Sequence, residues 1–461
     1  MKHFANLVLI LAGFACLAVL GFLLMRGGTF LADAPGESGL SGSIAFLGLP
    51  AAGTALCFGA LALRAEWRGL LAACLIAALV SVYGAELYLT YAADDPGEAA
   101  SAARGLNHDS RSKLDVLRDL RTYGITAYPF VHPALLLAPG GDGQSHSVIR
   151  IDGAEVQPVG GIGRVVTVVC REVGAYLIYT ADRHGFHNPP DAWPTAGGMA
   201  DILAIGDSFA QGQCVPDGQG MISRLRETVP ATVSLGAGHD GPLLMLAALR
   251  EFGDRLRPPV VLWLFYEGND LIIDLPRERR SPLLMQYLAP SFGQNLANRQ
   301  GPIDEALSAY ADEQLIATAA EERDAVRRRL LGIAKLHGLR QLLGATTSPP
   351  EPDLALFERV LARARDDVHG WGGRMVFAYL PSWNTLFRPT ASLDRMREDV
   401  LDIAHRLDLP VVDLLPAFDQ AADRHALFYY PGSHYSPEGH ALAAHEIGEA
   451  LEAGEAGDRL R

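Results

Sequence analysis

The run ILAIGDSFAQG, residues 202–212, decides how the rest of this chain is interpreted. Its first four residues are apolar and are bounded by polar or turn-forming residues, which predicts a short buried strand at Ile202–Ile205. Gly206 and Asp207 would then form a turn that presents the Ser208 hydroxyl at the end of the strand. A Gly-Asp-Ser tripeptide alone is also common in ordinary turns and helix caps, so its meaning depends on the residues that follow.

Downstream of this run, short apolar stretches alternate with amphipathic helical patterns. The apolar stretches are Ile202–Ile205, Thr232–Leu235, Val260–Tyr266, Met375–Leu380 and Pro410–Leu414, and the helical patterns lie at 218–228, 241–254, 353–369, 390–407 and 437–452. Continuous apolar strands that alternate with helices predict an α/β fold, in which helices cover both faces of a parallel sheet. Residues 280–345 interrupt the alternation as a mostly helical insertion.

Three further motifs accompany the predicted strands and the last helix. A glycine-rich turn at 236–241 follows the second strand, and its backbone can approach a ligand closely. Asn269 follows the third strand and carries an amide donor. His434 directly precedes a helix start marked by Ser-Pro-Glu at 436–438. Because ligands of parallel sheets bind beyond the carboxyl ends of the strands, these groups are expected to meet Ser208 at one edge of the sheet.

In this order, the four motifs resemble the sequence blocks of the SGNH (GDSL-like) hydrolase superfamily. The resemblance covers about residues 200–450, and it implies a flavodoxin-like three-layer parallel sheet. The run at 182–189, ahead of the serine block, also resembles bacterial relatives that carry membrane spans at the N-terminus. A bacterial, membrane-anchored member of the superfamily is therefore expected.

The resemblance implies acyl transfer through a covalent intermediate, with Ser208 as nucleophile and His434 as its base. The oxyanion is expected to accept hydrogen bonds from the Ser208 backbone N–H, from the backbone N–H of Gly238 or of His239, and from the Asn269 side chain. This chemistry needs no cofactor and no metal.

The acid that completes a Ser–His–Asp catalytic triad in the superfamily is missing from its usual position in this chain. Members of the superfamily usually carry an aspartate three residues before the histidine, where this chain has Pro431. A proline side chain cannot orient an imidazole, so Asp423 and Asp413 are the candidate acids for orienting His434. The remaining alternative is a Ser–His dyad in which a backbone carbonyl holds the ring.

The N-terminal region contains three apolar stretches long enough to cross a bilayer, at about 4–25, 43–63 and 69–92. A signal peptide is the competing interpretation of the first stretch, but the two that follow favour a retained anchor of three transmembrane helices. The connector at 64–68 holds two arginines, so the positive-inside rule predicts that it and the N-terminus are cytoplasmic. Arg26 does not fit this topology, because it would lie on the outer side of the membrane. The rest of the chain is then extracytoplasmic, on a bacterial inner membrane.

Between the anchor, residues 1–92, and the α/β domain, residues 199–461, the sequence predicts a membrane-proximal, partly β accessory region at 93–198. Ser110–Tyr123 has helical periodicity, with leucines on one face and charges on the other. Strand-like runs follow at 164–170 and 175–179.

Two of the five cysteines, Cys170 and Cys214, lie outside the apolar N-terminal stretches. In an oxidising compartment they could form a disulfide. The alternative is two separate buried thiols, since five cysteines are too few to indicate a disulfide scaffold.

Charge and topology limit the functions that this chain can have. A net charge of −14 argues against a broad nucleic-acid surface, because phosphate binding needs concentrated Lys and Arg. The leading hypothesis is an extracytoplasmic serine esterase or O-acyltransferase that acts on acyl, in particular acetyl, esters of a cell-surface glycan. Its expected partners are the lipid bilayer, a carbohydrate polymer or other acyl-ester substrate, and a polysaccharide-modification machinery. The alternative, favoured by Pro431, is a catalytically impaired glycan-binding scaffold of such a modification or export system.

Overall fold

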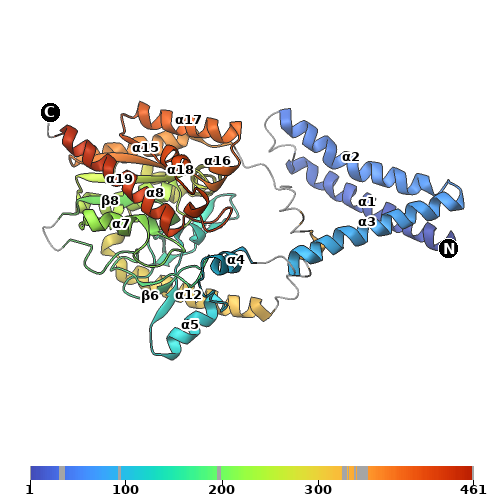
Figure 1. Ribbon diagram of the computed structural model, residues 1–461, viewed down its shortest axis with the longest axis horizontal. Coiled ribbons are helices and arrows are strands. Elements are labelled where there is room, and N and C mark those ends of the chain that lie inside the picture. The colour runs from blue at the N-terminus through green and yellow to red at the C-terminus, as the bar shows by residue number, and fades with distance from the viewer. Residues whose placement is uncertain are drawn as a thin grey trace. The chain divides into compact units, whose positions relative to one another are not determined.

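The computed structural model describes residues 2–30, 37–91, 95–194, 199–323 and 351–458, with a few more between 330 and 339 (Figure 1). The chain forms two compact units. The first comprises residues 1–93 and 325–346, and the second comprises residues 94–324 and 347–461.

The N-terminal part of the first unit forms helices α1 (Lys2–Phe30), α2 (Glu37–Ala60) and α3 (Ala65–Tyr91). Two segments are long and apolar enough to cross a membrane, His3–Gly21 and Ala65–Thr90, whereas the apolar part of α2 that is described, Pro50–Ala60, is shorter. Part of the predicted span at 43–63 falls on side chains outside the described residues. Two of the three expected spans therefore have a matching helix, and the middle span stays a prediction.

The second unit is built on a five-stranded parallel sheet with the order β12-β11-β10-β8-β9. Its strands are β8 (Ile202–Ile205), β9 (Thr232–Ser234), β10 (Val260–Tyr266), β11 (Arg374–Leu380) and β12 (Val411–Asp413). Numbered along the chain, this order is 2-1-3-4-5, the arrangement of flavodoxin-like folds. The predicted α/β parallel sheet is confirmed, and each strand end lies within one residue of its predicted position.

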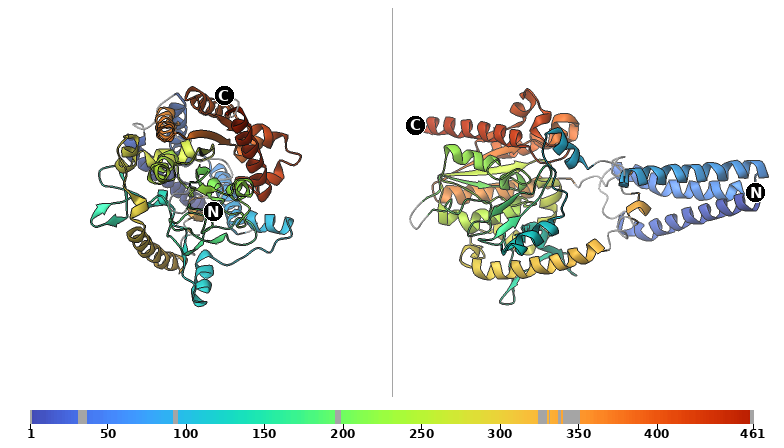
Figure 2. Two further views of the ribbon diagram at one scale, coloured as in Figure 1. Left: turned by 90° about the vertical axis from the view of Figure 1, so that its left-hand side faces the viewer. Right: turned by 60° about the horizontal axis from the view of Figure 1, so that its bottom comes forward.

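Helices cover both faces of this sheet (Figures 1 and 2). On β10, Trp263 and Phe265 point to one face and pack with residues from α8 (Pro242–Ala248), α15 (Leu354–Gly370) and α17 (Ala391–Arg406). Leu262 and Leu264 point to the other face and pack with residues from α7 (Met221–Thr228), α18 (Leu415–Gln420) and α19 (Pro437–Asp458). This period of two is expected for a strand that is buried on both sides.

The insertion after β10 is helical in its described part. It contains α11 (Pro282–Met285) and α12 (Gln300–Arg323). Ile303 and Leu307 of α12 are buried in the same core as α8 and α15. Residues 324–329 and most of residues 331–345 lie outside the described residues.

The accessory region begins with α4 (Pro96–Ala103) and α5 (Lys113–Thr122). A three-stranded sheet follows, in the order β1-β6-β7, with β1 (Ala127–Pro129) parallel to β6 (Val166–Val168) and β7 (Ile178–Thr180) antiparallel to it. Two small hairpins complete the region, formed by β2 (Leu137–Pro139) with β3 (Ser145–Ser147) and by β4 (Arg150–Ile151) with β5 (Ala154–Glu155).

The accessory region packs directly onto the α/β sheet. Leu136, Phe186 and Trp193 are buried in the core that also contains α8. The Asn188 amide nitrogen donates to the Ser234 carbonyl at 2.8 Å, and the Ser234 N–H donates to the Asn188 side-chain oxygen at 2.8 Å. These bonds fasten the accessory region to the end of β9, so its loops can contribute to the edge of the sheet where Ser208 lies.

Candidate active site

Ser208 lies directly beyond β8, at the first residue of the short helix α6 (Ser208–Gln211). The turn requires Gly206, because a Cβ on this residue would lie 2.8 Å from the Ala210 Cβ and 3.0 Å from the Leu264 Cβ. Asp207 caps α6 by accepting a hydrogen bond from the Phe209 N–H at 2.9 Å. The strand and the cap together fix the direction in which the serine hydroxyl points.

His434 lies in the loop before α19, and its side chain reaches Ser208 across 226 residues of sequence. The distance between His434 Nε2 and Ser208 Oγ is 3.0 Å, within hydrogen-bond reach for a nucleophile and its base. The neighbouring Tyr435 is fully buried, and its hydroxyl donates to the Pro381 carbonyl at 2.6 Å. This anchor holds the histidine loop against the carboxyl end of β11.

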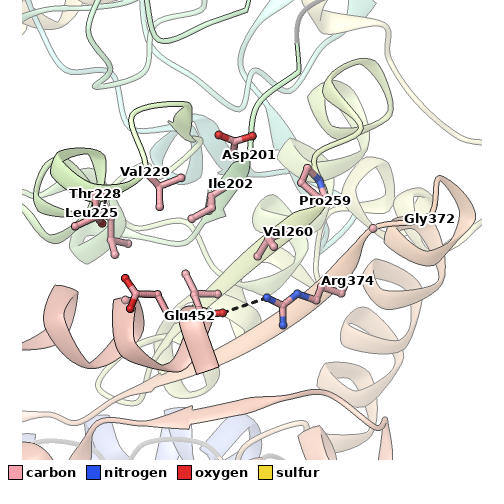
Figure 3. Close-up of a pocket in the computed structure, with 13 residues that line it drawn as sticks. Asp201, Ile202, Leu225, Thr228, Val229, Pro259, Val260, Gly372, Arg374 and Glu452 are labelled. Carbon is pink, nitrogen blue, oxygen red and sulfur yellow. Dashed lines mark hydrogen bonds between the residues drawn. The ribbon is translucent and has the colours of Figure 1, made fainter. Parts of the chain in front are cut away.

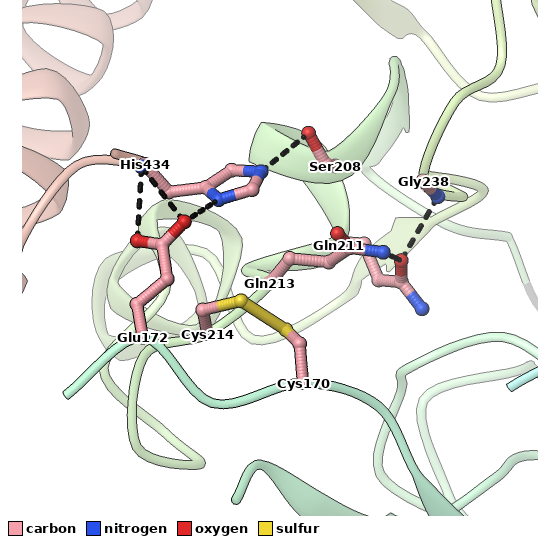
Figure 4. The surroundings of a disulfide bond; sticks show 8 residues. All are labelled: Cys170, Glu172, Ser208, Gln211, Gln213, Cys214, Gly238 and His434. Carbon is pink, nitrogen blue, oxygen red and sulfur yellow. Dashed lines mark hydrogen bonds and ion pairs between the residues drawn. A yellow bond between two sulfur atoms is a disulfide. The ribbon is translucent and has the colours of Figure 1, made fainter. Parts of the chain in front are cut away.

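The other ring nitrogen of His434 contacts Glu172, an acid that the sequence interpretation missed. The distance from His434 Nδ1 to Glu172 Oε1 is 2.7 Å, and the His434 backbone N–H donates to Glu172 Oε2 at 3.0 Å. Glu172 belongs to the loop after β6 in the accessory region, 262 residues away in sequence. Serine, histidine and glutamate therefore form one continuous chain of hydrogen bonds (Figure 4).

The two acids predicted to orient His434 are used elsewhere, and this prediction was wrong. The Asp413 carboxylate pairs with Arg397 and accepts the Leu415 N–H at 3.1 Å. Asp423 accepts the N–H groups of His425 at 3.0 Å and of Ala426 at 3.2 Å. Both carboxylates satisfy local backbone groups. The predicted alternative, a backbone carbonyl that orients the His434 ring, is not found either, because Nδ1 contacts the Glu172 carboxylate.

Two carboxylates influence the charge of His434. Burial alone would lower the pKa of the imidazole, but the hydrogen bond to Glu172 and the negative charges of Glu172 and Asp207 raise it above its ordinary value. Burial raises the pKa of Asp207, which accepts hydrogen bonds from Phe209, Asn269 and Ser208. A raised pKa makes an imidazole a stronger base, and the same two carboxylates would stabilise the imidazolium if His434 took the serine proton.

The expected oxyanion donors are arranged around the serine turn. The Gly238 N–H donates to the Gln211 side-chain oxygen at 2.9 Å, so it is occupied. His239 has a φ of 68°, a left-handed conformation more common for glycine, and its N–H has no hydrogen-bond partner within the described part of the chain. Of the two alternatives, His239 therefore has the available backbone donor.

The other two expected donors also lie beside the serine turn. The Ser208 N–H is at the first position of α6, where no intrahelical acceptor exists. The Asn269 amide donates one hydrogen to Asp207 Oδ2 at 3.2 Å, which holds the side chain next to Ser208. A substrate carbonyl oxygen could thus meet the N–H groups of Ser208 and His239 and the side-chain amide of Asn269.

Cys170 and Cys214 form a disulfide, with Cα atoms 5.2 Å apart. One ligand atom each from Glu172, Cys214 and His434 lies within 4.8 Å of the other two. This grouping has the composition of a metal site, but the Cys214 sulfur is bonded to Cys170, and the other two groups bond each other. Figure 4 shows the disulfide beside the glutamate and the histidine.

A pocket of about 570 Å³ lies at the opposite end of the sheet (Figure 3). Its lining includes Ile202, Val260 and Arg374, the first residues of β8, β10 and β11. These are the amino ends of the strands, whereas Ser208 lies beyond a carboxyl end. The pocket is therefore separate from the candidate active site.

No protein-family model matches this sequence, and no curated protein sequence matches it. Solved structures similar to it include a lipase/acylhydrolase from Enterococcus faecalis, with 13% identity, a TM-score of 0.33, and coverage of 55% of this chain and 96% of that chain. A GDSL-like lipase from Bacteroides thetaiotaomicron has 11% identity, a TM-score of 0.30 and coverage of 57% and 91%. A carbohydrate esterase family 2 enzyme with a carbohydrate-binding domain from Corynascus thermopiles has 12% identity, a TM-score of 0.34 and coverage of 57% and 69%.

The assignment of the fold rests on the strand order and on where the motifs lie on it. Ser208 follows the first strand of a 2-1-3-4-5 parallel sheet, and His434 precedes the last helix. The second unit has the SGNH hydrolase fold that the sequence motifs predicted.

Proposed function

We propose that this protein is a membrane-anchored serine esterase or O-acyltransferase. One observation carries the proposal, the chain of hydrogen bonds from Ser208 Oγ through the His434 ring to the Glu172 carboxylate. A nucleophile in contact with a base, which is oriented in turn by a third group, is the arrangement that activates a serine hydroxyl.

In the first step, His434 Nε2 removes the Ser208 proton as the serine oxygen attacks the ester carbonyl carbon. The carbonyl oxygen becomes an oxyanion, which accepts hydrogen bonds from the N–H groups of Ser208 and His239 and from the Asn269 amide. As the tetrahedral intermediate collapses, the imidazolium gives its proton to the leaving alcohol and the acyl group stays on Ser208. Glu172 stabilises the imidazolium and fixes the ring by accepting the hydrogen bond from Nδ1–H.

In the second step, an acceptor hydroxyl attacks the acyl-enzyme while His434 removes its proton. A water molecule as acceptor gives a free carboxylic acid, and a sugar hydroxyl gives a new ester. The proton then returns from His434 to Ser208, which restores the resting site. Hydrolysis and transfer use the same residues, so the acceptor that enters the site decides between them.

The substrate class follows from the expected location of the site. Two apolar helices of the first unit have the length of membrane spans. Disulfides persist in oxidising compartments, so the Cys170–Cys214 bond supports an extracytoplasmic second unit. An outward-facing site on a bacterial inner membrane suits acyl, in particular acetyl, esters of a cell-surface glycan and a partner machinery that modifies the polysaccharide.

The alternative of a catalytically impaired scaffold rested on Pro431, which cannot orient His434. Glu172 supplies the carboxylate that the proline lacks, so this reason for an inactive site is removed. If folded protein has no reactive serine, the glycan-binding scaffold is the better explanation.

A fluorophosphonate probe tests the proposal on the full chain in detergent. We expect labelling of the wild type and its loss in Ser208→Ala, because only an activated serine reacts with the probe at a useful rate. Ser392→Ala, which removes an exposed serine at the start of α17, is the matched control and should label normally. Acetate release from an acetylated glycan, with and without an acceptor sugar, then separates hydrolysis from transfer. Absence of labelling in folded wild-type protein would reject the enzyme.

A further inference from the structure

Glu172 reaches His434 from outside the α/β sheet, and this placement raises the question of what holds it there. Its loop leaves β6 of the small accessory sheet, whereas Ser208 and His434 belong to loops of the main sheet. An orienting carboxylate must stay within hydrogen-bond distance of the imidazole, because misplacement by about 1 Å can cost about 10²-fold in rate. The Glu172 loop therefore needs a firm attachment to the serine and histidine loops.

The Cys170–Cys214 disulfide provides a covalent attachment at this point. Cys170 precedes Glu172 by two positions, and Cys214 follows α6, the helix that begins with Ser208. The bond thus joins the segment that carries the acid to the segment that carries the nucleophile. The Cys214 sulfur also lies within 4.8 Å of a Glu172 carboxylate oxygen and of a His434 ring nitrogen, directly beside the pair (Figure 4).

The backbone of Cys214 has an uncommon conformation. Cys214 has a φ of 61°, a left-handed conformation that residues other than glycine adopt rarely. Such a conformation persists where surrounding contacts impose it, and the bond to Cys170 is one of these contacts. The attachment is therefore part of the local geometry of the site.

Weaker contacts also hold the Glu172 loop, so loss of the disulfide should leave the fold in place. Val173 is buried with Ala100, Val215 and Tyr429. The Gly174 N–H donates to the Ser101 hydroxyl of α4 at 2.9 Å. These contacts keep the loop near the sheet. The Glu172 carboxylate itself contacts the backbone N–H and the ring Nδ1 of His434, and both contacts depend on where the loop places it.

We propose that the Cys170–Cys214 disulfide is a positioning element of the active site, which holds the Glu172 carboxylate against His434 Nδ1. The inference rests on the proposed serine mechanism. Without the bond, the protein keeps its fold and the Ser208–His434 contact, but the carboxylate no longer stays at the imidazole. The competing explanation is a disulfide that only stabilises the folded unit.

The pH dependence of kcat/KM separates these two explanations. His434 acts as a base only when neutral, and the negative charge of Glu172 raises its pKa. The wild-type acid limb should therefore lie above the ordinary histidine value. Loss of the Glu172 contact removes the stabilisation of the imidazolium, so the limb should move to lower pH while kcat falls. A disulfide that only stabilises the fold would leave the limb where it is.

A double-mutant cycle on the full chain in detergent makes the test, with p-nitrophenyl acetate as substrate. Cys170→Ala/Cys214→Ala is compared with Glu172→Gln and with the triple variant, and Cys74→Ala is the matched control for loss of a cysteine. Glu172→Gln should lower kcat by about 10²–10⁴-fold, and the cysteine pair by about 10–10²-fold. Both should shift the acid limb downward with little change in KM. In the Glu172→Gln background, loss of the disulfide should change kcat by less than about twofold.

Cysteine variants with an unchanged kcat and pH profile would overturn the inference, as would losses that multiply in the triple variant. If the variants do not fold, folded wild-type protein reduced with a water-soluble phosphine replaces them, with circular dichroism as the check on folding. Retained activity would again overturn the inference. EDTA is present throughout, because a free Cys214 thiolate beside Glu172 and His434 would form a zinc-binding set of ligands.

Failure of the proposed function gives a different result. If Ser208 is not the nucleophile, wild-type protein neither labels with fluorophosphonate nor turns over the ester. If only the positioning role is wrong, labelling and turnover are present in the wild type and survive in the cysteine variants.

Discussion

At the residue scale, the part of the site that local sequence specifies could be predicted. Ser208 and His434 are recognisable because each lies in a motif tied to a strand end or a helix start, and such ends meet at one edge of a parallel sheet. Glu172 has no such signal. Its role arises from tertiary packing that brings together residues 262 positions apart. Cys170 was the only hint in the sequence, since a disulfide to Cys214 places the neighbouring Glu172 beside the serine segment.

Asn269 is the residue whose replacement most directly tests the oxyanion site. Removing one preorganised donor typically lowers kcat by about 10²–10³-fold, because the donor stabilises charge that develops only in the transition state. We therefore expect Asn269→Ala to lower kcat by this amount with little change in KM, measured with p-nitrophenyl acetate.

The matched control for this prediction is Asn384→Ala, which removes an exposed asparagine amide beyond β11. Asn269→Asp adds a second check, since a carboxylate of the same shape cannot donate and would repel the oxyanion. Its kcat should be at least as low as that of Asn269→Ala. Near-normal turnover in both Asn269 variants would show that this side chain does not stabilise the transition state.

At the element scale, the strands of the main sheet were predicted well, and the strands of the accessory region were not. The strands β8, β9, β10 and β11 of the main sheet are buried along nearly their whole length, so their apolar runs stand out. In the accessory region, the strand predicted at 164–170 is only Val166–Val168, and that predicted at 175–179 is Ile178–Thr180. The length of such short strands is set by their partners in space, which the sequence does not show.

The helix predicted at 241–254 illustrates the same limit. It consists of α8, one π-helical turn at Leu249–Gly253 and the short helix α9 (Asp254–Leu256). Hydrophobic periodicity predicts that a helix covers the sheet, but it cannot distinguish a π-helical turn from a regular α-helical one.

The disulfide should also contribute to global stability, independently of its role at the site. A cross-link across a sequence separation of 44 residues restricts the unfolded chain, which corresponds to about 4 kcal/mol in the chain-entropy model. We expect the Cys170→Ala/Cys214→Ala variant to lose about 2–4 kcal/mol in its free energy of unfolding, measured by urea denaturation followed by tryptophan fluorescence. Cys74→Ala, the control, should keep the midpoint of this transition. A loss below about 0.5 kcal/mol in the double variant would contradict a stabilising cross-link.

At the scale of the whole molecule, the sequence did not indicate how closely the accessory region and the α/β sheet combine. The accessory region and the α/β sheet form one compact unit, because apolar residues of the former, such as Phe186 and Trp193, complete the core of the latter. These residues are scattered through a region rich in turns, without a period that would assign them to a common face. Their joint burial places the Glu172 loop beside Ser208 and His434, at the candidate active site.

The pH dependence of stability is a property of this combined unit, and it follows from carboxyl groups buried beneath the glycine turn. Burial raises the pKa of Asp274 to about 7 and that of Glu278 to about 8. The unfolded chain has ordinary carboxyl pKa values near 4, so between pH 4 and 8 the folded state holds protons that the unfolded state has released. Folding stability contributed by these groups therefore falls as pH rises through this range.

Buried histidines set the lowest pH at which the contribution of these carboxyl groups to stability can be measured by itself. Burial lowers the pKa of His132 and of His440 to about 3, so these rings stay neutral in the folded state while the unfolded chain protonates below about pH 6.5. They oppose the carboxyl effect only below that pH. His434, whose pKa is raised, loses its stabilising contribution as pH rises and so adds to the carboxyl effect.

We therefore expect Asp274 and Glu278 together to lower the free energy of unfolding by about 2 kcal/mol between pH 6.5 and pH 8, because each unit of pH costs about 1.4 kcal/mol per proton retained by the folded state. Urea denaturation of the full chain at several pH values measures this slope. Glu278→Gln replaces the carboxyl group by an amide that cannot titrate, so this variant should have a flatter slope between pH 7 and 8. The variant should also be less stable at every pH, because the Glu278 carboxylate accepts hydrogen bonds from the N–H groups of Gly241, Leu243 and Leu244. Glu98→Gln, at an exposed position of α4, should keep the wild-type slope. Stability that rises from pH 6.5 to 8 would mean that these carboxyl groups are already ionised in the folded protein.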